Sequence, residues 1–306
     1  MRNTFANAFY EIAKKDPRLF LVVADISPVA SAAAFQKEYP ERFVNVGVAE
    51  QVMVGVAAGL ALRGCIPFAY TIATFTIYRP FEQVRVDCCY QNLPVKLVGI
   101  GGGVTYSTLG GTHHSQEDIA IMSALPNMSI IAPCDPSETV AATHACIHVP
   151  GPVYLRLGKA GEPDLTSNAP DPFQFGKVRF IKRGVDLCII SYGPITKMAL
   201  DLAHNFEKAK RGSVAVVSAH TLKPLDREGI ASILASYPAV IVLEEHSCVG
   251  GLSAQVKQIA WDVRATCKLK TFSLQDKFIH FYGSQRELWT AHGLDEGLIL
   301  SDMKNL

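Results

Sequence analysis

The sequence predicts an α/β protein built from two doubly wound sheet domains, and three features of its pattern indicate this fold. Short β-branched runs alternate with amphipathic stretches along the chain, which is typical of βαβ units. The strand-like runs are apolar throughout, as expected for parallel strands that are buried on both faces. The chain has 306 residues, about half of them hydrophobic, and this length suits about two domains of roughly 150 residues each.

The first domain is expected over residues 1–158, where apolar runs predict the strands of a parallel sheet. Helices are expected between these runs, because apolar residues recur there at helical spacing. The predicted strands are 19–25, 66–71, 95–100, 129–133 and 153–157. The predicted helices are 5–15, 50–63, 79–92, 116–123 and 137–147.

A linker is expected over residues 159–176, which are rich in Pro, Gly, Asp and Ser. The alternating pattern then restarts and predicts a second α/β domain over residues 177–306. Its predicted strands are 186–193, 213–219, 239–245 and 268–274, and its predicted helices are 195–210, 226–236, 250–264 and 284–304.

Composition and charge narrow the class of protein. The net charge is +1 and no Lys/Arg stripe with interleaved aromatics occurs, so nucleic-acid binding is not expected. The longest apolar run, 52–62, is shorter than the ~20 residues that span a bilayer. No secretory signal is evident at the start, and the eight scattered cysteines form no CxxC pair. These features predict a cytoplasmic protein with reduced thiols.

Glu50 stands at the front of an otherwise apolar segment, "FVNVGVAEQVMVGVAAGLALRGCIPFAY" (43–70). Burying an unpaired carboxylate is costly in free energy. A carboxylate in such a place therefore usually has a partner or a chemical task.

The segment "VGIGGGVTYSTLGGTHHSQED" (98–118) is a glycine-rich loop after a predicted strand. It fails the dinucleotide fingerprint, because Val104 stands where the third glycine belongs. Loops at the carboxyl ends of strands nevertheless form the ligand crevice in α/β folds. His113 and His114 end this loop, and histidine suits proton transfer near neutral pH. Adjacent side chains diverge, so we expect one of the two to lead the chemistry.

Two further clusters leave alternatives open. Phe75 and Tyr78 follow a predicted strand, where they could form an aromatic wall for a planar ligand or pack into the core. His144 and His148 have the spacing of a metal-binding helix. No third ligand accompanies them, so a plain helix surface is the favoured interpretation and no metal site is predicted.

Together these motifs resemble the pyrimidine-binding and C-terminal domains of transketolases, over essentially the whole chain. The resemblance rests on "VGVAEQ", the aromatic cluster after it, the loop ending in Thr-His, "NMSIIAPCDPSE" and, in the second domain, "EEHSCVGGLSAQV". Related families are the 1-deoxyxylulose-5-phosphate synthases and the β subunits of 2-oxoacid dehydrogenase E1 components. All of them use thiamine diphosphate.

The resemblance implies roles for four residues of the cofactor site. Glu50 matches the glutamate that hydrogen-bonds the N1′ nitrogen of the aminopyrimidine and favours its imino tautomer. Phe75 matches the aromatic side chain that stacks on the pyrimidine, with Tyr78 as a neighbour in the same wall. Asp25 matches a residue near the thiazolium ring, although an ordinary aspartate at a strand end is the alternative.

Other matches concern the substrate. His113 matches the histidine of the transketolase T-H motif, and His114 matches the histidine of the dehydrogenase H-S-Q motif. We expect the pair to act as general acid and base, with His113 leading. Arg2 and Lys159 match cations that bind the substrate phosphate. Leu109 replaces an aspartate that contacts sugar hydroxyls, which implies a specialised sugar.

The sequence has no Gly-Asp-Gly motif, which in larger transketolases helps to hold Mg²⁺ and the cofactor diphosphate. The resemblance therefore implies a split enzyme, with an N-terminal subunit that supplies these groups in a heterotetramer of two subunits of each kind. The implied function is transferase activity, moving a two-carbon ketol unit from a ketose (phosphate) donor to an aldose acceptor. The alternatives are a subunit of a 2-oxoacid-decarboxylating enzyme, of the E1 β or deoxyxylulose-phosphate synthase type, and a non-catalytic regulatory or scaffold subunit.

Overall fold

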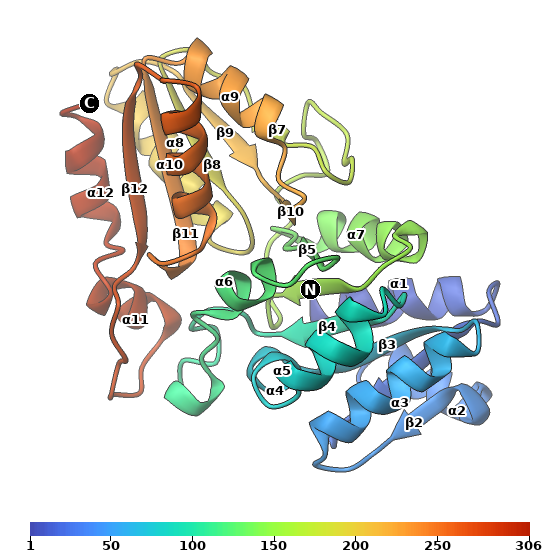
Figure 1. Cartoon of the computed structure of the whole chain (residues 1–306). Coiled ribbons are helices and arrows are strands. Elements are labelled where there is room, and N and C mark those ends of the chain that lie inside the picture. The colour runs from blue at the N-terminus through green and yellow to red at the C-terminus, as the bar shows by residue number, and fades with distance from the viewer.

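Six strands of the first half and one short strand of the second half form a seven-stranded sheet (Figure 1), in a computed structural model that describes residues 1–306. The strand order is β10-β5-β6-β4-β3-β1-β2, and every neighbouring pair is parallel except β10 with β5. The strands are β1 (Leu19–Val23), β2 (Phe43–Asn45), β3 (Ile66–Ile72), β4 (Lys96–Ile100), β5 (Ser129–Ile131), β6 (Val153–Leu157) and β10 (Thr221–Lys223).

Helices cover both faces of this sheet, because successive strand residues point to opposite faces. On β4, Leu97 packs into the core cluster that includes helix α3, whereas Val98 packs into the cluster of α1 and α7. The helices of this half are α1 (Arg2–Ala13), α2 (Ser31–Glu38), α3 (Glu50–Leu62), α4 (Ala73–Ile77), α5 (Phe81–Gln83), α6 (Asp118–Ser123) and α7 (Pro136–His148). Three segments of other helix types are the 3₁₀ turns η1 (Pro40–Arg42) and η3 (Gly111–His113) and the wider π-helix η2 (Val84–Tyr90).

The second half builds a five-stranded sheet in the order β12-β11-β8-β9-β7, parallel except for β7 with β9. Its strands are β7 (Arg179–Lys182), β8 (Leu187–Ser191), β9 (Val214–Ser218), β11 (Ala239–Ser247) and β12 (Lys268–Leu274). Its helices are α8 (Thr196–Lys208), α9 (Arg227–Ser236), α10 (Leu252–Asp262), α11 (Gln285–Ala291) and α12 (Glu296–Met303).

The predicted architecture of two doubly wound α/β domains is confirmed, but several elements differ from the sequence expectations. The predicted helix 284–304 is two helices, because Gly293 takes a left-handed φ of 82° between them. The predicted helix 79–92 is a short α-turn followed by a π-helix. The sequence analysis also missed the strands β2, β7 and β10 and the helix α2.

The state of the cysteines and the character of the helices are two further properties of the fold. All eight cysteines are free, and five of them are buried. Burial raises the pKa of Cys146 to about 12 and that of Cys89 to about 11, so both remain protonated at neutral pH. None of the helices has the length and apolar character needed to cross a bilayer.

Candidate active site

The predicted site residues follow the carboxyl ends of strands in the first sheet. Asp25 follows β1, Glu50 follows β2, and Phe75 follows β3. His113 lies in the loop after β4, and Lys159 follows β6. Because these strands are parallel and adjacent, their carboxyl ends meet at one edge of the sheet, where α/β proteins bind ligands.

Glu50 is the first residue of α3 and is 3% exposed. The helix N-terminus favours a negative charge there, because its free N–H groups give it a partial positive charge. The buried carboxylate also has a partner: Arg79 donates from Nη1 to both oxygens, at 3.1 and 3.0 Å. The carboxylate therefore lies at the edge of the apolar segment, where a ligand of the right shape could reach it.

Phe75 connects Glu50 to the histidine loop. Phe75 lies on α4, and the guanidinium carbon of Arg79 is 4.7 Å from the centre of its ring. The ring of His113 meets Phe75 edge to face, with centroids 5.2 Å apart and an interplanar angle of 72°. Glu50, Arg79, Phe75 and His113 thus form one continuous line of contacts.

His113 is partly exposed at the end of η3, and burial lowers the pKa of its imidazole below the ordinary 6.5. Nδ1 lies 2.9 Å from Oγ1 of Thr112, which fixes the ring orientation. The ring is therefore largely neutral at pH 7. In the tautomer where the hydroxyl donates to Nδ1, Nε2 carries the proton; in the other tautomer, Nε2 is the free base.

His114 points into the protein. It is 3% exposed, and neither ring nitrogen has a hydrogen-bond partner. Burial, and then the neighbouring His113, lower its pKa. Because the backbone of His114 is extended, with φ −82° and ψ 136°, its side chain points in a different direction from that of His113. The structure thus brings only His113 of the two against Phe75.

Tyr78 is tied to the neighbouring loop. Its hydroxyl donates to Oε2 of Glu117 at 2.7 Å, and its ring packs against the core cluster of α3. Burial, and then Asp118, raise the pKa of the phenol far above its ordinary range. Tyr78 thus connects the segment after α4 to the start of α6. It is close to Phe75 in the sequence, but its hydroxyl bonds to Glu117, whereas the Phe75 ring contacts His113.

Asp25 is exposed and has a left-handed φ of 45°, a conformation that non-glycine residues rarely adopt. Its backbone N–H donates to the side-chain oxygen of Asn45 at 3.2 Å. Asn45 also accepts from the backbone N–H of Gly47 at 3.0 Å. A single amide thus ties the end of β1 to the turn that leads into Glu50.

Arg2 and Lys159 are in contact with each other near the carboxyl ends of the same strands. The backbone N–H of Arg2 donates to the carbonyl of Lys159 at 3.2 Å. The Arg2 side chain donates to the hydroxyl of Tyr70 at 3.0 Å and to the carbonyl of Ser27 at 3.2 Å. The Lys159 ammonium lies 5.1 Å from the ring centre of Tyr106, whose ring is 6.1 Å from that of His113. The Lys159 ammonium therefore stands one aromatic ring away from His113, and Arg2 is joined to Lys159 through the backbone.

The second domain positions the glycine loop. Oε1 of Glu245, on β11, accepts from the backbone N–H of Val104 at 2.8 Å. At Gly103, which has a φ of 69°, a Cβ atom would lie 2.6 Å from the Glu245 side chain. At Gly101, with a φ of 78°, a Cβ atom would lie 2.2 Å from the Tyr106 ring. The glycines are therefore needed for close packing of the loop. This need accounts for their number, and phosphate binding is not required to explain it.

Sequence reasoning missed Arg79, Asn45 and Tyr106. For Arg79 the pattern contained a usable feature, because residues four apart on a helix share a face and Phe75 and Arg79 have this spacing. Tyr106 and Asn45 act through contacts between loops that follow different strands, and no local spacing indicates these contacts.

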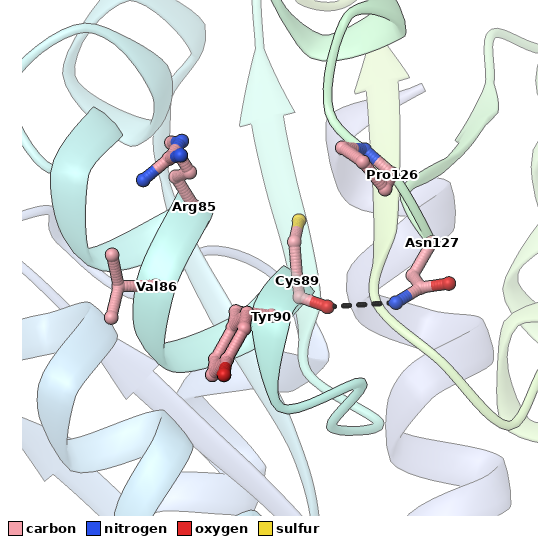
Figure 2. A pocket seen from close by; sticks show the side chains of 6 residues that line it. All are labelled: Arg85, Val86, Cys89, Tyr90, Pro126 and Asn127. Carbon is pink, nitrogen blue, oxygen red and sulfur yellow. Dashed lines mark hydrogen bonds between the residues drawn. The ribbon is translucent and has the colours of Figure 1, made fainter.

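A cavity of about 400 Å³ lies elsewhere on the first domain (Figure 2). It is lined by Arg85, Val86, Cys89, Tyr90, Pro126 and Asn127, and the Asn127 amide donates to the carbonyl of Cys89 at 3.0 Å. These residues precede β4 and β5, so the cavity lies at the amino ends of the strands. It is therefore at the opposite edge of the sheet from Glu50 and His113.

Comparison with protein families matches both halves of the chain. Residues 1–161 match the family described as "Transketolase, pyrimidine binding domain". Residues 176–296 match the family described as "Transketolase, C-terminal domain".

Three curated relatives are similar along nearly the whole chain or most of it. A subunit of the apulose-4-phosphate transketolase of Phocaeicola vulgatus is 34% identical, over 96% of this chain and 93% of the relative. A subunit of the 6-deoxy-6-sulfo-D-fructose transketolase of Clostridium sp. is 36% identical, over 83% and 78%. The 1-deoxy-D-xylulose-5-phosphate synthase of Oleidesulfovibrio alaskensis is 31% identical over 95% of this chain, which spans 46% of that relative.

A solved structure described as "Split gene transketolase, inactive beta4 tetramer" has the same fold. It superposes with a TM-score of 0.87 at 33% identity, covering 99% of this chain and 96% of that chain.

Proposed function

Because the chain belongs to the transketolase family, in which it comprises the pyrimidine-binding and C-terminal domains, we propose that it is one subunit of a split transketolase. In this proposal it acts with thiamine diphosphate to transfer a two-carbon ketol unit from a ketose (phosphate) donor to an aldose acceptor. Two relatives that this chain covers over most of their length are described as transketolase subunits rather than complete enzymes.

The observation that carries the proposal is the placement of a buried carboxylate, an aromatic face and a histidine along one edge. Glu50 is buried at a helix N-terminus, and Phe75 presents its ring to the same space that Arg79 now occupies. A planar aminopyrimidine needs a ring to stack on and a carboxyl group facing its ring nitrogen. Arg79, itself planar and rich in N–H donors, makes both contacts, so the residues present fit that group.

Each side chain has a definable task in this scheme. When bound, thiamine diphosphate supplies the electron sink for breaking and forming carbon–carbon bonds. Glu50 would give up or take back a proton at its carboxyl oxygens, next to the pyrimidine, and Phe75 would pack against the face of that ring. His113, largely neutral at pH 7, accepts and returns the proton of a substrate hydroxyl through Nε2.

The substrate end of the proposed site is cationic. Lys159 lies beside Tyr106, next to the His113 ring, and the backbone N–H of Arg2 donates to Lys159. Two cations can bind a phosphate or another anionic group on a sugar, with Arg2 offering the more directional hydrogen bonds. Leu109 is 47% exposed in the same loop and offers no hydrogen bond to a sugar hydroxyl. We therefore propose that the substrate is an anionic sugar with a modified pattern of hydroxyls. The names of two relatives, an apulose-4-phosphate transketolase and a 6-deoxy-6-sulfo-D-fructose transketolase, also contain anionic sugars that are not standard pentose phosphates.

A partner subunit is part of the proposal. We propose that this partner holds the diphosphate and Mg²⁺ and that the complex contains two subunits of each kind. Cys134, Asp135 and Glu138 are the one cluster of metal-ligand types in the chain, and hydrogen bonds already engage its carboxylates. The similar solved structure, described as an inactive tetramer of β chains, supports the need for a second kind of subunit.

Calorimetric titration of thiamine diphosphate with Mg²⁺ tests the proposal, on this chain alone and on its mixture with the candidate partner subunit. We expect binding in the mixture, and we expect Glu50→Gln to lose turnover in the complex, since the amide cannot exchange the proton that the carboxyl group can. Glu228→Gln is the matched control, because the side chain of Glu228 is 94% exposed on α9. Undiminished binding and turnover in Glu50→Gln would instead support a scaffold role for this chain.

A further inference from the structure

Arg79 makes an unusual pair of contacts for a surface arginine. Its Nη1 donates to both oxygens of Glu50, at 3.1 and 3.0 Å, and its guanidinium lies 4.7 Å from the ring centre of Phe75. The side chain of Arg79 is 49% exposed, whereas that of Glu50 is 4% exposed. The guanidinium therefore closes the mouth of the buried carboxylate from the solvent side.

A guanidinium and an aminopyrimidine share the chemical features needed to lie between the Phe75 ring and the Glu50 carboxylate. Both are flat and delocalised, and both carry N–H groups in the plane that can face a carboxylate. Both can stack on an aromatic face, through cation–π or π contacts. An aminopyrimidine placed on Phe75 with its ring nitrogen facing Glu50 would meet the Arg79 guanidinium in the same space.

Building on the function proposed above, we infer that Arg79 is a placeholder that occupies the pyrimidine position of the free chain and must leave it when the cofactor binds. One guanidinium nitrogen donates to both oxygens of Glu50 while the group lies over the Phe75 ring, so a pyrimidine stacked on that ring and facing Glu50 would need the space that the guanidinium fills. Arg79 is thus a positioning residue, which keeps Glu50 paired and oriented until the exchange.

The location of Arg79 makes this exchange feasible. Arg79 lies in the turn between α4 and α5, and about half of its side chain already contacts solvent. Rotation of its long stem can carry the charged end into water while the stem stays against the protein. The ion pair is only partly buried, so salt weakens it.

Substitution of Arg79 by methionine tests the inference, because methionine keeps a long flexible stem and lacks the guanidinium. Thiamine diphosphate with Mg²⁺ is titrated into complexes of the partner subunit with the wild type, Arg79→Met, Arg79→Lys and Arg85→Met. We expect Arg79→Met to bind about tenfold more tightly, since an exposed ion pair and a cation–π contact no longer compete. Arg79→Lys, which keeps the charge without the planar group, should bind with an intermediate affinity.

Arg85→Met is the matched control, because Arg85 is exposed on η2 and lines the cavity at the opposite edge of the sheet. Its affinity should equal that of the wild type. The ratio between the wild type and Arg79→Met should also shrink as salt is raised, because screening weakens the competing ion pair.

Two outcomes would count against the inference in different ways. Equal or weaker binding by Arg79→Met, with binding by the wild type intact, would overturn the placeholder role and leave the proposed function standing. Arg79 would then support the bound cofactor. An absence of binding in the wild type and in every variant would overturn the proposed function and the placeholder role together.

Discussion

His113 combines a fixed orientation with an accessible ring. The hydroxyl of Thr112 fixes one ring nitrogen and the edge contact with Phe75 fixes the plane of the ring. A base that works at neutral pH must be unprotonated, and burial of His113 favours that form by lowering its pKa. His114, with both ring nitrogens unpartnered inside the protein, lacks this exposure.

Replacement of His113 by asparagine tests its role in proton transfer. We expect kcat to fall by about 10²-fold or more, because asparagine can hydrogen-bond but cannot accept the proton. In the wild type, kcat/KM should fall on acidification with a midpoint below pH 6.5, because protonation removes the base and its pKa lies below that ordinary value. Steady-state kinetics of the complex with its partner, across pH, measure both effects.

The exposed His204 on α8 offers a control, and His204→Asn should leave the rate and the pH profile unchanged. If His113→Asn kept the acid limb of the wild type, another group would be the base.

At the residue scale, the sequence was sufficient to nominate Glu50 from its apolar surroundings, Phe75 from an aromatic cluster after a predicted strand, and His113 from the end of a glycine-rich loop. Their assignment to a cofactor remains a proposal. The contacts of Arg79 with Glu50 could not be predicted from the sequence. The start of α3 and the turn after α4 come together only because of the order of the strands in the sheet.

At the element scale, Asp118 anchors α6 to β6. It is completely buried, and it accepts hydrogen bonds from Tyr154 at 2.7 Å and from Nε of Arg156 at 2.8 Å. Burial acts to raise the pKa of Asp118, but Arg156, His246 and these hydrogen bonds outweigh it and hold the pKa below the ordinary value. Arg156 also donates to the carbonyl of Glu245 at 3.0 Å, so the pair joins α6, β6 and β11.

Replacement of Asp118 by asparagine should lower the free energy of unfolding by about 3–5 kcal/mol, because it leaves the Arg156 charge buried without a counter-charge. Chemical denaturation of the purified chain measures this change. Asp302→Asn removes an exposed pair with Lys270, whose charged atoms are 3.1 Å apart, and should cost less than about 1 kcal/mol. Similar losses in the two variants would show that the buried pair contributes little.

Periodicity predicted the long apolar strands well, as with β3, β6 and β8, because full burial leaves an uninterrupted apolar run. The three-residue strands β2 and β10 escaped prediction because they are too short to establish a period. The π-helix η2 also escaped, since its extra residue per turn depends on packing rather than on composition.

At the scale of the whole molecule, His220 joins three parts of the chain. Its ring stacks on Phe173, from the segment between β6 and β7, with centroids 4.0 Å apart. Its carbonyl accepts from the backbone N–H of Ala132, beyond β5, at 2.7 Å. Burial, with a smaller contribution from Arg179, lowers the pKa of His220 to about 3.

This shift predicts a stability that falls on acidification. His220 takes up a proton near pH 6.5 in the unfolded chain but only near pH 3 in the folded chain, so protons favour unfolding between these values. The contribution to the free energy of unfolding should fall by about 1.4 kcal/mol per pH unit in this range. His220→Phe keeps a ring against Phe173 and should remove that part of the slope, measured by denaturation between pH 7 and about pH 4.

His204→Asn, on an exposed surface, should keep the slope of the wild type. A His220→Phe variant with an unchanged slope would mean that His220 is already protonated in the folded chain.

The strand β10 comes from the second half of the chain but completes the first sheet, pairing antiparallel with β5. Lys223 at its end donates to the carbonyls of Ser123 and Leu125 in the first half. Without β10, the N–H and C=O groups along β5 would form an open edge, which invites pairing with other chains. A fragment that ends within the linker should therefore be prone to aggregate, and it would also lose the buried residues that the second half adds to the shared core cluster. The second domain supplies the strand that keeps the first sheet from self-association. We therefore expect gene exchange or fusion to preserve the two domains together rather than to separate them.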